Sequence, residues 1–219
     1  MNQSRRITVV TAFIDWNSQI HAACALPTAS AVELTRHTLS YVGRTIGRVL
    51  TGIDNARRFD VTLRLYHGWY QGFEATSRRK AMIQVFAAAD FVSLSTRTNV
   101  VIRPSLNFGD ALTSAITARC FPKLGCNLPN TLRKDINNKD TIVEKMVDTA
   151  IASELVDLAH REPHRWLMLI GEDDDLVPPI YVAEGVREEK KGEKGKVLLI
   201  RKRKETPFLK LNQLRYAPS

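Results

Sequence analysis

The sequence predicts an α/β fold in which a mostly parallel central sheet is covered by helices on both faces. Three observations lead to this prediction. Short apolar and β-branched segments recur along the chain, segments with apolar residues at helical spacing separate them, and no internal repeat is present. A chain of 219 residues is long enough to bury a proper core as one domain, or as one domain with an appendage.

Five short segments are predicted as strands. The first is nearly all apolar and β-branched, which suits a strand buried on both faces of a parallel sheet. The second alternates apolar and polar residues, and the third is expected to end at Pro104. The predicted strands cover residues 7–14, 61–66, 99–103, 166–170 and 196–200.

Four segments are predicted as helices because their apolar residues recur at helical spacing. Ser30 is suited to cap the first helix, and Gly52 is expected to stop it. Thr141 and Glu144 have the spacing of a capping box at the start of the third helix. The predicted helices cover residues 30–50, 77–89, 140–160 and 178–189.

Residues 1–205 are predicted to form one domain, and residues 206–219 a C-terminal tail. Within the domain, residues 104–138 are rich in Gly, Pro and Asn and are expected to be an irregular insertion, with a helical turn or two around residues 111–118. Residues 188–196 consist almost entirely of charged residues and glycine, so we expect an exposed linker there.

Composition points to a soluble globular protein, with 44% hydrophobic and 25% charged residues. No apolar run approaches the roughly 20 residues that span a bilayer, and the first residues do not have the layout of a signal peptide. The three cysteines cannot all pair, and Cys120 and Cys126 lack a second ligand pair at zinc spacing. We therefore expect a cytoplasmic protein that is not bound to a membrane.

The net charge of +9 is concentrated at the C-terminal end of the chain. Residues 186–219 hold eleven Lys or Arg against four Glu, whereas the first 185 residues have a balance of only +2. A basic segment beside an acidic cluster suits a protein that binds a polyanion, because the cations hold phosphates and the carboxylates hold metal. A solvated, Lys-rich surface hairpin would give the same charge pattern.

Carboxylates gather where two of the predicted strands end. Asp15 follows the first strand, and the acidic run Glu172 to Asp175 follows the strand at residues 166–170. The carboxyl ends of parallel strands lie along one edge of a sheet, so these acids are expected at the same edge. Asp148 lies on the helix just before the acidic strand and could join them.

Adjacent carboxylates repel one another, and a hard divalent cation such as Mg²⁺ or Mn²⁺ would remove that repulsion. Asp173 and Asp175 are expected to face the metal, because alternate residues share a face, while Asp174 and Glu172 point elsewhere. Each acid also has an ordinary explanation. The run could be a solvated loop, Asp15 could cap the next helix, and Asp148 could be an exposed helix acid.

Three short segments contain these acids: Phe13-Ile-Asp-Trp-Asn17, then Lys145-Met-Val-Asp148 with Glu154 six residues later, and Gly171-Glu-Asp-Asp-Asp-Leu-Val-Pro178. Together they resemble the motifs of the NYN family of PIN-like nucleases. Their order and spacing match over most of residues 7–200, although residues 20–138 contain no motif of the family. Gly-Glu replaces the usual Ser-Gly before the first Asp of the third motif, and Leu176 replaces Phe.

The resemblance implies a PIN-like three-layer fold and metal-dependent hydrolysis of phosphodiester bonds that leaves 5′ phosphates. Asp15, Asp148 and Asp173 match the metal-binding acids of the family, with Asp175 as a fourth. The supporting residues that the motifs suggest are Asn17, Lys145 and Glu154. The expected substrate is RNA in preference to DNA, cut by an endonuclease, and a homo-oligomer or a protein partner is left open.

Basic residues outside the motifs are expected to hold the phosphate backbone of the substrate. The candidates are Arg78, Arg79, Lys80, Arg201, Lys202, Arg203 and Lys204. Trp16 or Trp69 could stack on an unpaired base, although packing in the core is the favoured reading of both.

Two other functions remain open from the sequence. One is a nuclease-like domain that binds RNA or a protein without cutting. The other is a phosphatase of the haloacid dehalogenase type, which also has an Asp after its first strand. That class has a second Asp two residues later, where this chain has Asn17.

Overall fold

The chain folds as a three-layer α/β structure around one parallel sheet. The computed structural model describes residues 7–24, 29–112, 128, 131–135, 141–188, 192, 195–202 and 215–216. The strands are β1 (Ile7–Asp15), β2 (Arg58–Tyr66), β3 (Tyr70–Gln71), β4 (Glu74–Ala75), β5 (Val100–Phe108), β6 (Leu132–Lys134), β7 (Ile142–Glu144), β8 (Trp166–Ile170), β9 (Val197–Ile200) and β10 (Arg215–Tyr216). The helices are α1 (Trp16–Ala22), α2 (Ala31–Ile53), α3 (Ser77–Ala88), α5 (Val147–Arg161), the 3-10 turn η2 (Asp174–Leu176) and α6 (Val177–Glu188).

The central sheet has six strands in the order β10-β9-β8-β1-β2-β5, and every neighbouring pair is parallel. The chain builds the sheet outward from β1 through β2 and β5, then crosses back to β8 on the other side of β1 and continues outward. The strand order therefore reverses between β1 and β8. In open α/β sheets, ligands bind beyond the carboxyl ends of the strands at this reversal.

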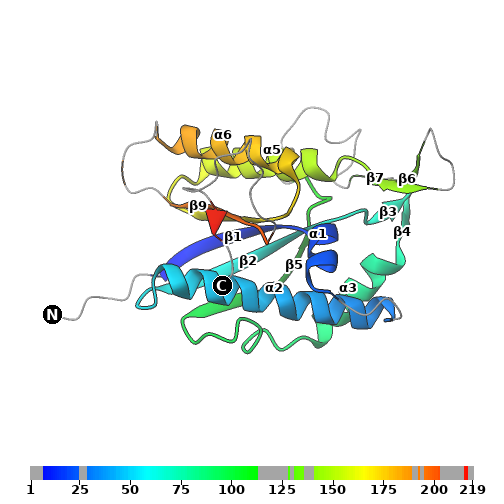
Figure 1. Cartoon of the computed structure of the whole chain (residues 1–219), viewed down its shortest axis with the longest axis horizontal. Helices are drawn as coiled ribbons and strands as arrows, with labels where there is room; N and C mark the ends of the chain where they lie inside the picture. The colour runs from blue at the N-terminus through cyan, green and yellow to red at the C-terminus, as the bar shows by residue number, and fades with distance from the viewer. Residues whose placement is uncertain are drawn as a thin grey trace.

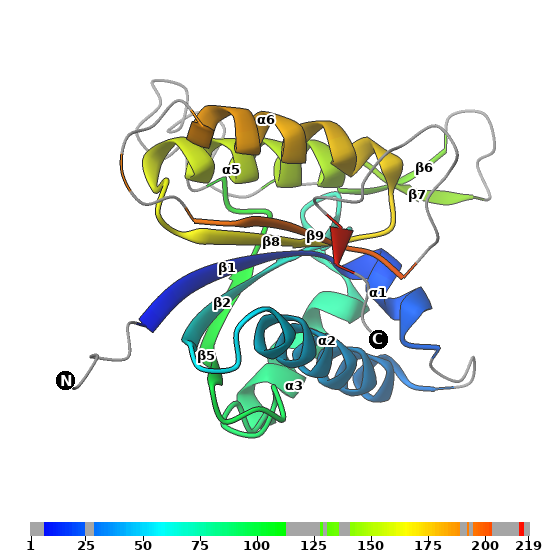
Figure 2. The same cartoon turned by 60° about the vertical axis from the view of Figure 1, so that its left-hand side comes forward.

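Each face of the sheet carries its own helical layer, and Figures 1 and 2 show the sheet between them. Side chains alternate along β1, so that Val10, Ala12 and Ile14 join the core beneath α2 and α3 while Phe13 joins the core beneath α5 and α6. Strand β8 divides in the same way, because Met168 lies in the first core and its neighbours lie in the second. Both faces of β1 and β8 are covered, which explains why these two segments are almost uniformly apolar.

The α/β fold with a parallel sheet and helices on both faces is confirmed. Ser30 caps α2 as predicted, with its side chain accepting a hydrogen bond from the backbone N–H of Glu33 and the Glu33 carboxylate accepting from the backbone N–H of Ser30. The helix does not stop at Gly52 and continues to Ile53.

The prediction that the third strand ends at Pro104 is wrong, since β5 continues through Pro104 to Phe108. The strand lies at the edge of the sheet, where a residue without a backbone N–H is tolerated. Its register with β2 shifts beside the proline, since Val61 pairs with Ile102 but Leu63 pairs with Leu106. The bulge accommodates the proline, which cannot donate a backbone hydrogen bond, and the strand continues beyond it.

The predicted helix at residues 140–160 begins later than expected. Residues Ile142–Glu144 form β7, which pairs antiparallel with β6, and α5 begins at Val147. The residue before it, Met146, has a positive φ of 68° and provides no side-chain cap. The side chain of Glu144 binds Gly68 and His67 and does not cap a helix, so the predicted capping box is wrong.

Other predictions about the elements differ from the structure or lie outside the described residues. Helix α1 follows β1 directly and lies outside the four predicted helical segments, although capping of a helix by Asp15 was one of the alternatives. Arg215 and Tyr216, placed in the tail, pair with β9 as the sixth strand. Most of the insertion, residues 113–118 of its predicted helical turns, and most of the linker lie outside the described residues. Among the described helices, none combines the length and the apolar character needed to cross a bilayer.

Candidate active site

The site lies where β1 and β8 end side by side. In the register of the sheet, Ile14 pairs with Ile170, so the next residues, Asp15 and Gly171, leave the two strands together. A Cβ atom on Gly171 would lie 3.3 Å from Cβ of Asp15 and 2.9 Å from a methyl carbon of Leu176. Glycine therefore lets the loop after β8 pass close to Asp15.

Asp15 both ends β1 and caps α1. Its carboxylate accepts a hydrogen bond of 3.4 Å from the backbone N–H of Ser18, and the Ser18 hydroxyl donates to the Asp15 carbonyl oxygen. The side chain is buried, with 7% of its surface exposed. Burial raises the pKa of Asp15 above its usual value, and repulsion from Glu144 adds to this, while the Ser18 hydrogen bonds and His67 act in the opposite direction. The alternative role as a helix cap is thus correct and coexists with a place in the site.

Asp148 lies in the first turn of α5, at the surface of the site. Partial burial of its carboxyl group raises its pKa to about 6, and repulsion from four other carboxylates contributes in the same direction. Those carboxylates, in decreasing order, are Asp15, Asp173, Glu144 and Asp175. The carboxylates of β1, of β7 and of the loop after β8 therefore all raise the pKa of Asp148.

Asp173 and Asp175 lie in the turn that follows β8. Asp173 caps η2, accepting a hydrogen bond of 3.0 Å from the backbone N–H of Asp175, and both side chains are exposed. Asp174 instead pairs with Arg201, at 2.7 Å. Within the described part of the chain, no Lys or Arg pairs with Asp15, Asp148, Asp173 or Asp175.

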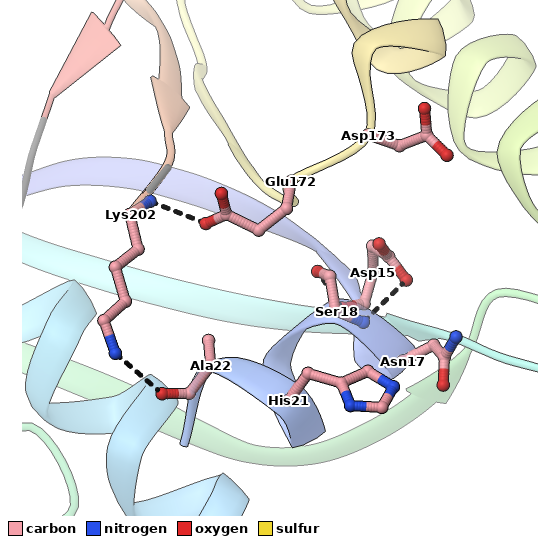
Figure 3. Close-up of a pocket in the computed structure, with 8 residues that line it drawn as sticks. All are labelled: Asp15, Asn17, Ser18, His21, Ala22, Glu172, Asp173 and Lys202. Carbon is pink, nitrogen blue, oxygen red and sulfur yellow. Dashed lines mark hydrogen bonds between the residues drawn. The ribbon is translucent and has the colours of Figure 1, made fainter. Parts of the chain in front are cut away.

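The four carboxylates match a divalent cation in their chemistry but not in their spacing. Carboxylate oxygens are the ligands that Mg²⁺ and Mn²⁺ prefer, so the chemistry of the donors fits. The carboxylates are too far apart to form a closed ligand shell. Among the described residues, no three His, Cys, Asp or Glu side chains lie close enough together to share an ion. In Figure 3 the carboxylate of Asp173 points away from that of Asp15.

A pocket of about 630 Å³ opens beside Asp15 and Asp173. Figure 3 shows α1 forming one wall and the loop after β8 another. Its lining residues are Asp15, Asn17, Ser18, His21, Ala22, Glu172, Asp173 and Lys202. The predicted supporting residue Asn17 thus lines the same pocket as Asp15, and Lys202 supplies a cation, with its ammonium group 3.3 Å from the Ala22 carbonyl oxygen.

Glu144 and His67 belong to this region and were missed as site residues. The Glu144 carboxylate accepts a hydrogen bond of 2.6 Å from the backbone N–H of Gly68 and contacts Nδ1 of His67. Burial tends to raise the pKa of Glu144, but the hydrogen bond and charge interaction with His67, the Gly68 N–H and Arg78 lower it below its usual value. His67 follows the end of β2, so the strand-end rule that identified Asp15 could have identified it.

Three of the predicted phosphate-binding residues have other roles. Arg201 is buried, and its guanidinium binds Asp174 and the carbonyl oxygen of Glu172, which corrects its predicted role. Arg79 pairs with the buried Asp110 at 2.6 Å and lies over the Phe108 ring, so it is not free to bind a phosphate. Arg78 binds Nε2 of His67 at 3.1 Å.

Other predicted residues are placed as follows. Lys80 and Lys145 are exposed, and Arg203 and Lys204 lie outside the described residues. Glu154 is buried and paired with Arg64 at 2.5 Å, which separates it from the unpaired acids.

The two tryptophans belong to the core. Trp16 and Trp69 are 1% and 0% exposed, so neither can stack on a base. The indole N–H of Trp69 donates to the Leu65 carbonyl oxygen.

Comparison of the chain with protein-family models, with curated proteins and with solved structures finds no match.

Proposed function

We propose that the protein is a metal-dependent nuclease that hydrolyses phosphodiester bonds, with RNA as the substrate in preference to DNA. One observation carries the proposal: at the reversal of strand order, partial burial together with repulsion from carboxylates of three separate segments raises the pKa of Asp148 to about 6. The resemblance of three motifs to the NYN family, and with it a PIN-like fold, supports the same assignment.

In this proposal, Asp15, Asp148, Asp173 and Asp175 hold Mg²⁺ or Mn²⁺ through carboxylate oxygens. A bound ion supplies an acidic water molecule and polarises a phosphoryl oxygen. Asn17 lies on the same pocket wall as Asp15 and is placed to touch the substrate beside the carboxylates. Lys202 is placed to hold a phosphate at the opposite end of the pocket. A nucleophilic His or Ser is not required.

The test uses labelled single-stranded RNA and DNA with Mg²⁺, Mn²⁺ or EDTA. Cleavage is expected with either metal and not with EDTA, and it should be lost in Asp15→Asn and in Asp173→Asn. Asp157→Asn is the matched control, because it makes the same change on the surface of α5, at a residue paired with Arg161. All variants are compared at equal folded fraction, measured by thermal unfolding.

Two outcomes would replace the proposal. Binding of RNA without cleavage under any metal would support a non-catalytic RNA-binding domain, a reading that the wide spacing of the carboxylates favours. Hydrolysis of p-nitrophenyl phosphate with covalent labelling of Asp15 would support the phosphatase instead.

A further inference from the structure

Two small hairpins extend the molecule beyond the carboxyl end of β2. Strands β3 and β4 form the first, β6 and β7 form the second, and β3 contacts β6. We call them together the double hairpin, and Figure 1 shows its four strands gathered on one side of the molecule. Tyr66, the last residue of β2, is the register partner of Asp15, so the double hairpin begins at the edge of the candidate active site.

Phe73 lies at the turn of the first hairpin and is 86% exposed. The turn is tight, because Gly72 adopts a φ of 61° that favours glycine. A single exposed apolar side chain is common on protein surfaces and does not by itself indicate a binding site. Here the exposed aromatic ring lies at the tip of a hairpin whose chain leaves β2 at Tyr66, the register partner of Asp15.

The base of the hairpin that carries Phe73 is held by a bond across its own ends, by the second hairpin and by α3. The backbone N–H of Thr76 donates to the Trp69 carbonyl oxygen at 3.0 Å, and the backbone N–H of Tyr70 donates to the Thr131 hydroxyl at 3.1 Å. The guanidinium of Arg79 lies over the Tyr70 ring. The ring of Phe73 is therefore presented on a braced element, and little conformational freedom is lost when a ligand contacts it.

The second hairpin, which contacts the first through β3 and β6, carries positive charge. Lys134 at the end of β6 and Lys145 just after β7 are both exposed. Within the described residues, neither ammonium group has an ion-pair partner. Glu144, the acid just before Lys145, is bound to Gly68 and His67, so it does not neutralise that lysine.

We propose that the double hairpin binds single-stranded nucleic acid, with Phe73 stacked on an unpaired base and Lys134 and Lys145 holding the neighbouring phosphates. The inference rests on the proposed nuclease function and names its substrate class. An aromatic ring beside cations is the usual surface for single strands, because every base has a face that can stack. A duplex covers those faces with its own neighbouring pairs, so the same ring selects against it.

The test measures binding in EDTA, so that cleavage does not enter. A fluorescent single-stranded RNA of about 12 nucleotides, within the range of known single-strand sites, is titrated by anisotropy. Phe73→Ala should weaken binding roughly 5- to 100-fold, which corresponds to the loss of one stacked base, and Phe73→Trp should restore it. Binding of a blunt duplex of the same length should be unchanged by Phe73→Ala.

Val92→Ala is the matched control, because Val92 is 90% exposed. It lies in the loop between α3 and β5, which leads to the amino end of β5, whereas the double hairpin lies beyond the carboxyl end of β2. Lys134→Gln and Lys145→Gln should each lower the slope of log affinity against log salt by about 0.7, as expected for one phosphate contact to a single strand. Glu74→Gln, in the same hairpin as Phe73, should not reduce the slope.

Equal affinities of Phe73→Ala and Val92→Ala for the single strand would overturn the inference. So would an oligomer, seen by sedimentation, that becomes monomeric in Phe73→Ala while RNA affinity is unchanged, because Phe73 would then contact a second copy of the chain. Failure of the nuclease proposal has a different signature: the wild-type protein would bind RNA through Phe73 but would not cleave it with Mg²⁺ or Mn²⁺.

Discussion

Nδ1 of His67 contacts the carboxylate of Glu144, and this contact joins the end of β2 to the segment that leads into α5. The guanidinium of Arg78 lies 3.1 Å from Nε2 of the same ring, so the imidazole is held between Glu144 and Arg78. Asp148 follows Glu144 by one tight turn through Met146, so the contact also determines where Asp148 lies relative to Asp15.

Glu144→Ala is expected to lower the cleavage rate roughly 10- to 100-fold, the range seen when groups that orient metal ligands are removed. The reason is that the turn before α5 loses its attachment to Gly68 and His67. Glu144→Gln should retain part of the activity, because its amide oxygen can still accept the Gly68 hydrogen bond. The rates are measured at saturating RNA, with the exposed Glu74→Ala as control. A wild-type rate in Glu144→Ala would show that Asp148 is positioned without this contact.

Asp148→Asn is expected to stabilise the metal-free protein at neutral pH. The pKa of Asp148 is raised from 3.8 to about 6, so the folded state holds the proton more tightly than the unfolded state. Stability is therefore lost as the pH rises from about 4 to about 6 and stays reduced above that, and the amide removes this loss. The measurement is Tm in EDTA on both sides of pH 6, and the gain should appear mainly on the alkaline side.

Mn²⁺ is expected to raise the Tm of the wild-type protein, because a ligand that binds only the folded state stabilises it, and Asp148→Asn should lose this increase. Asp157→Asn, on the same helix, should show neither effect. A Tm of Asp148→Asn that rises with Mn²⁺ as the wild type does would exclude Asp148 as a ligand.

Asp173→Asn and Asp174→Asn are expected to have opposite consequences. Loss of the Asp173 carboxylate should reduce cleavage by roughly 100-fold or more, the scale of removing one charge-stabilising group, with little change in stability. Asp174→Asn should leave cleavage nearly intact but cost about 1 to 3 kcal/mol, because it weakens the bond to the buried Arg201. Cleavage and urea denaturation of both variants check this, and a loss of cleavage confined to Asp174→Asn would reverse the assignment.

Gly171→Ala is expected to lower both stability and activity. The added methyl group would lie 2.9 Å from a Leu176 methyl carbon and 3.3 Å from Cβ of Asp15, so the loop after β8 must move outward from β1. Gly185→Ala in α6 is the control, because nothing lies within 4 Å of its added Cβ atom. That change should stabilise the protein by up to about 1 kcal/mol, as alanine favours a helix more than glycine does. Urea denaturation and the cleavage rate are measured for both, and equal behaviour of the two variants would contradict the close packing at Gly171.

The strands and the acids at their ends could be predicted from sequence, because both depend on local patterns. A buried parallel strand is uniformly apolar, and its carboxyl end lies at the edge of the sheet where ligands bind. Asp15 and Asp173 follow directly from those two rules. Ser30 as a cap of α2 is equally local, since its partner Glu33 is three residues away.

The errors arise where distant contacts override a local pattern. Thr141 and Glu144 have the spacing of a capping box, but Glu144 binds Gly68 and His67, which only the folded chain brings near. Arg201 was assigned to phosphate by its basic neighbours, yet Asp174 on the adjacent strand end binds it. No local pattern distinguishes a cation that faces solvent from one that pairs across the sheet.

The reversal of strand order between β1 and β8 also determines when the site can exist during synthesis. Asp15 leaves the ribosome early, whereas β8 and Asp173 are made only after β2, β5 and α5. At about 5 to 20 residues per second, roughly 8 to 30 seconds separate the two strand ends. During that interval Asp15 has no partner carboxylates from α5 or from the loop after β8, so the site can assemble only after most of the chain has been made.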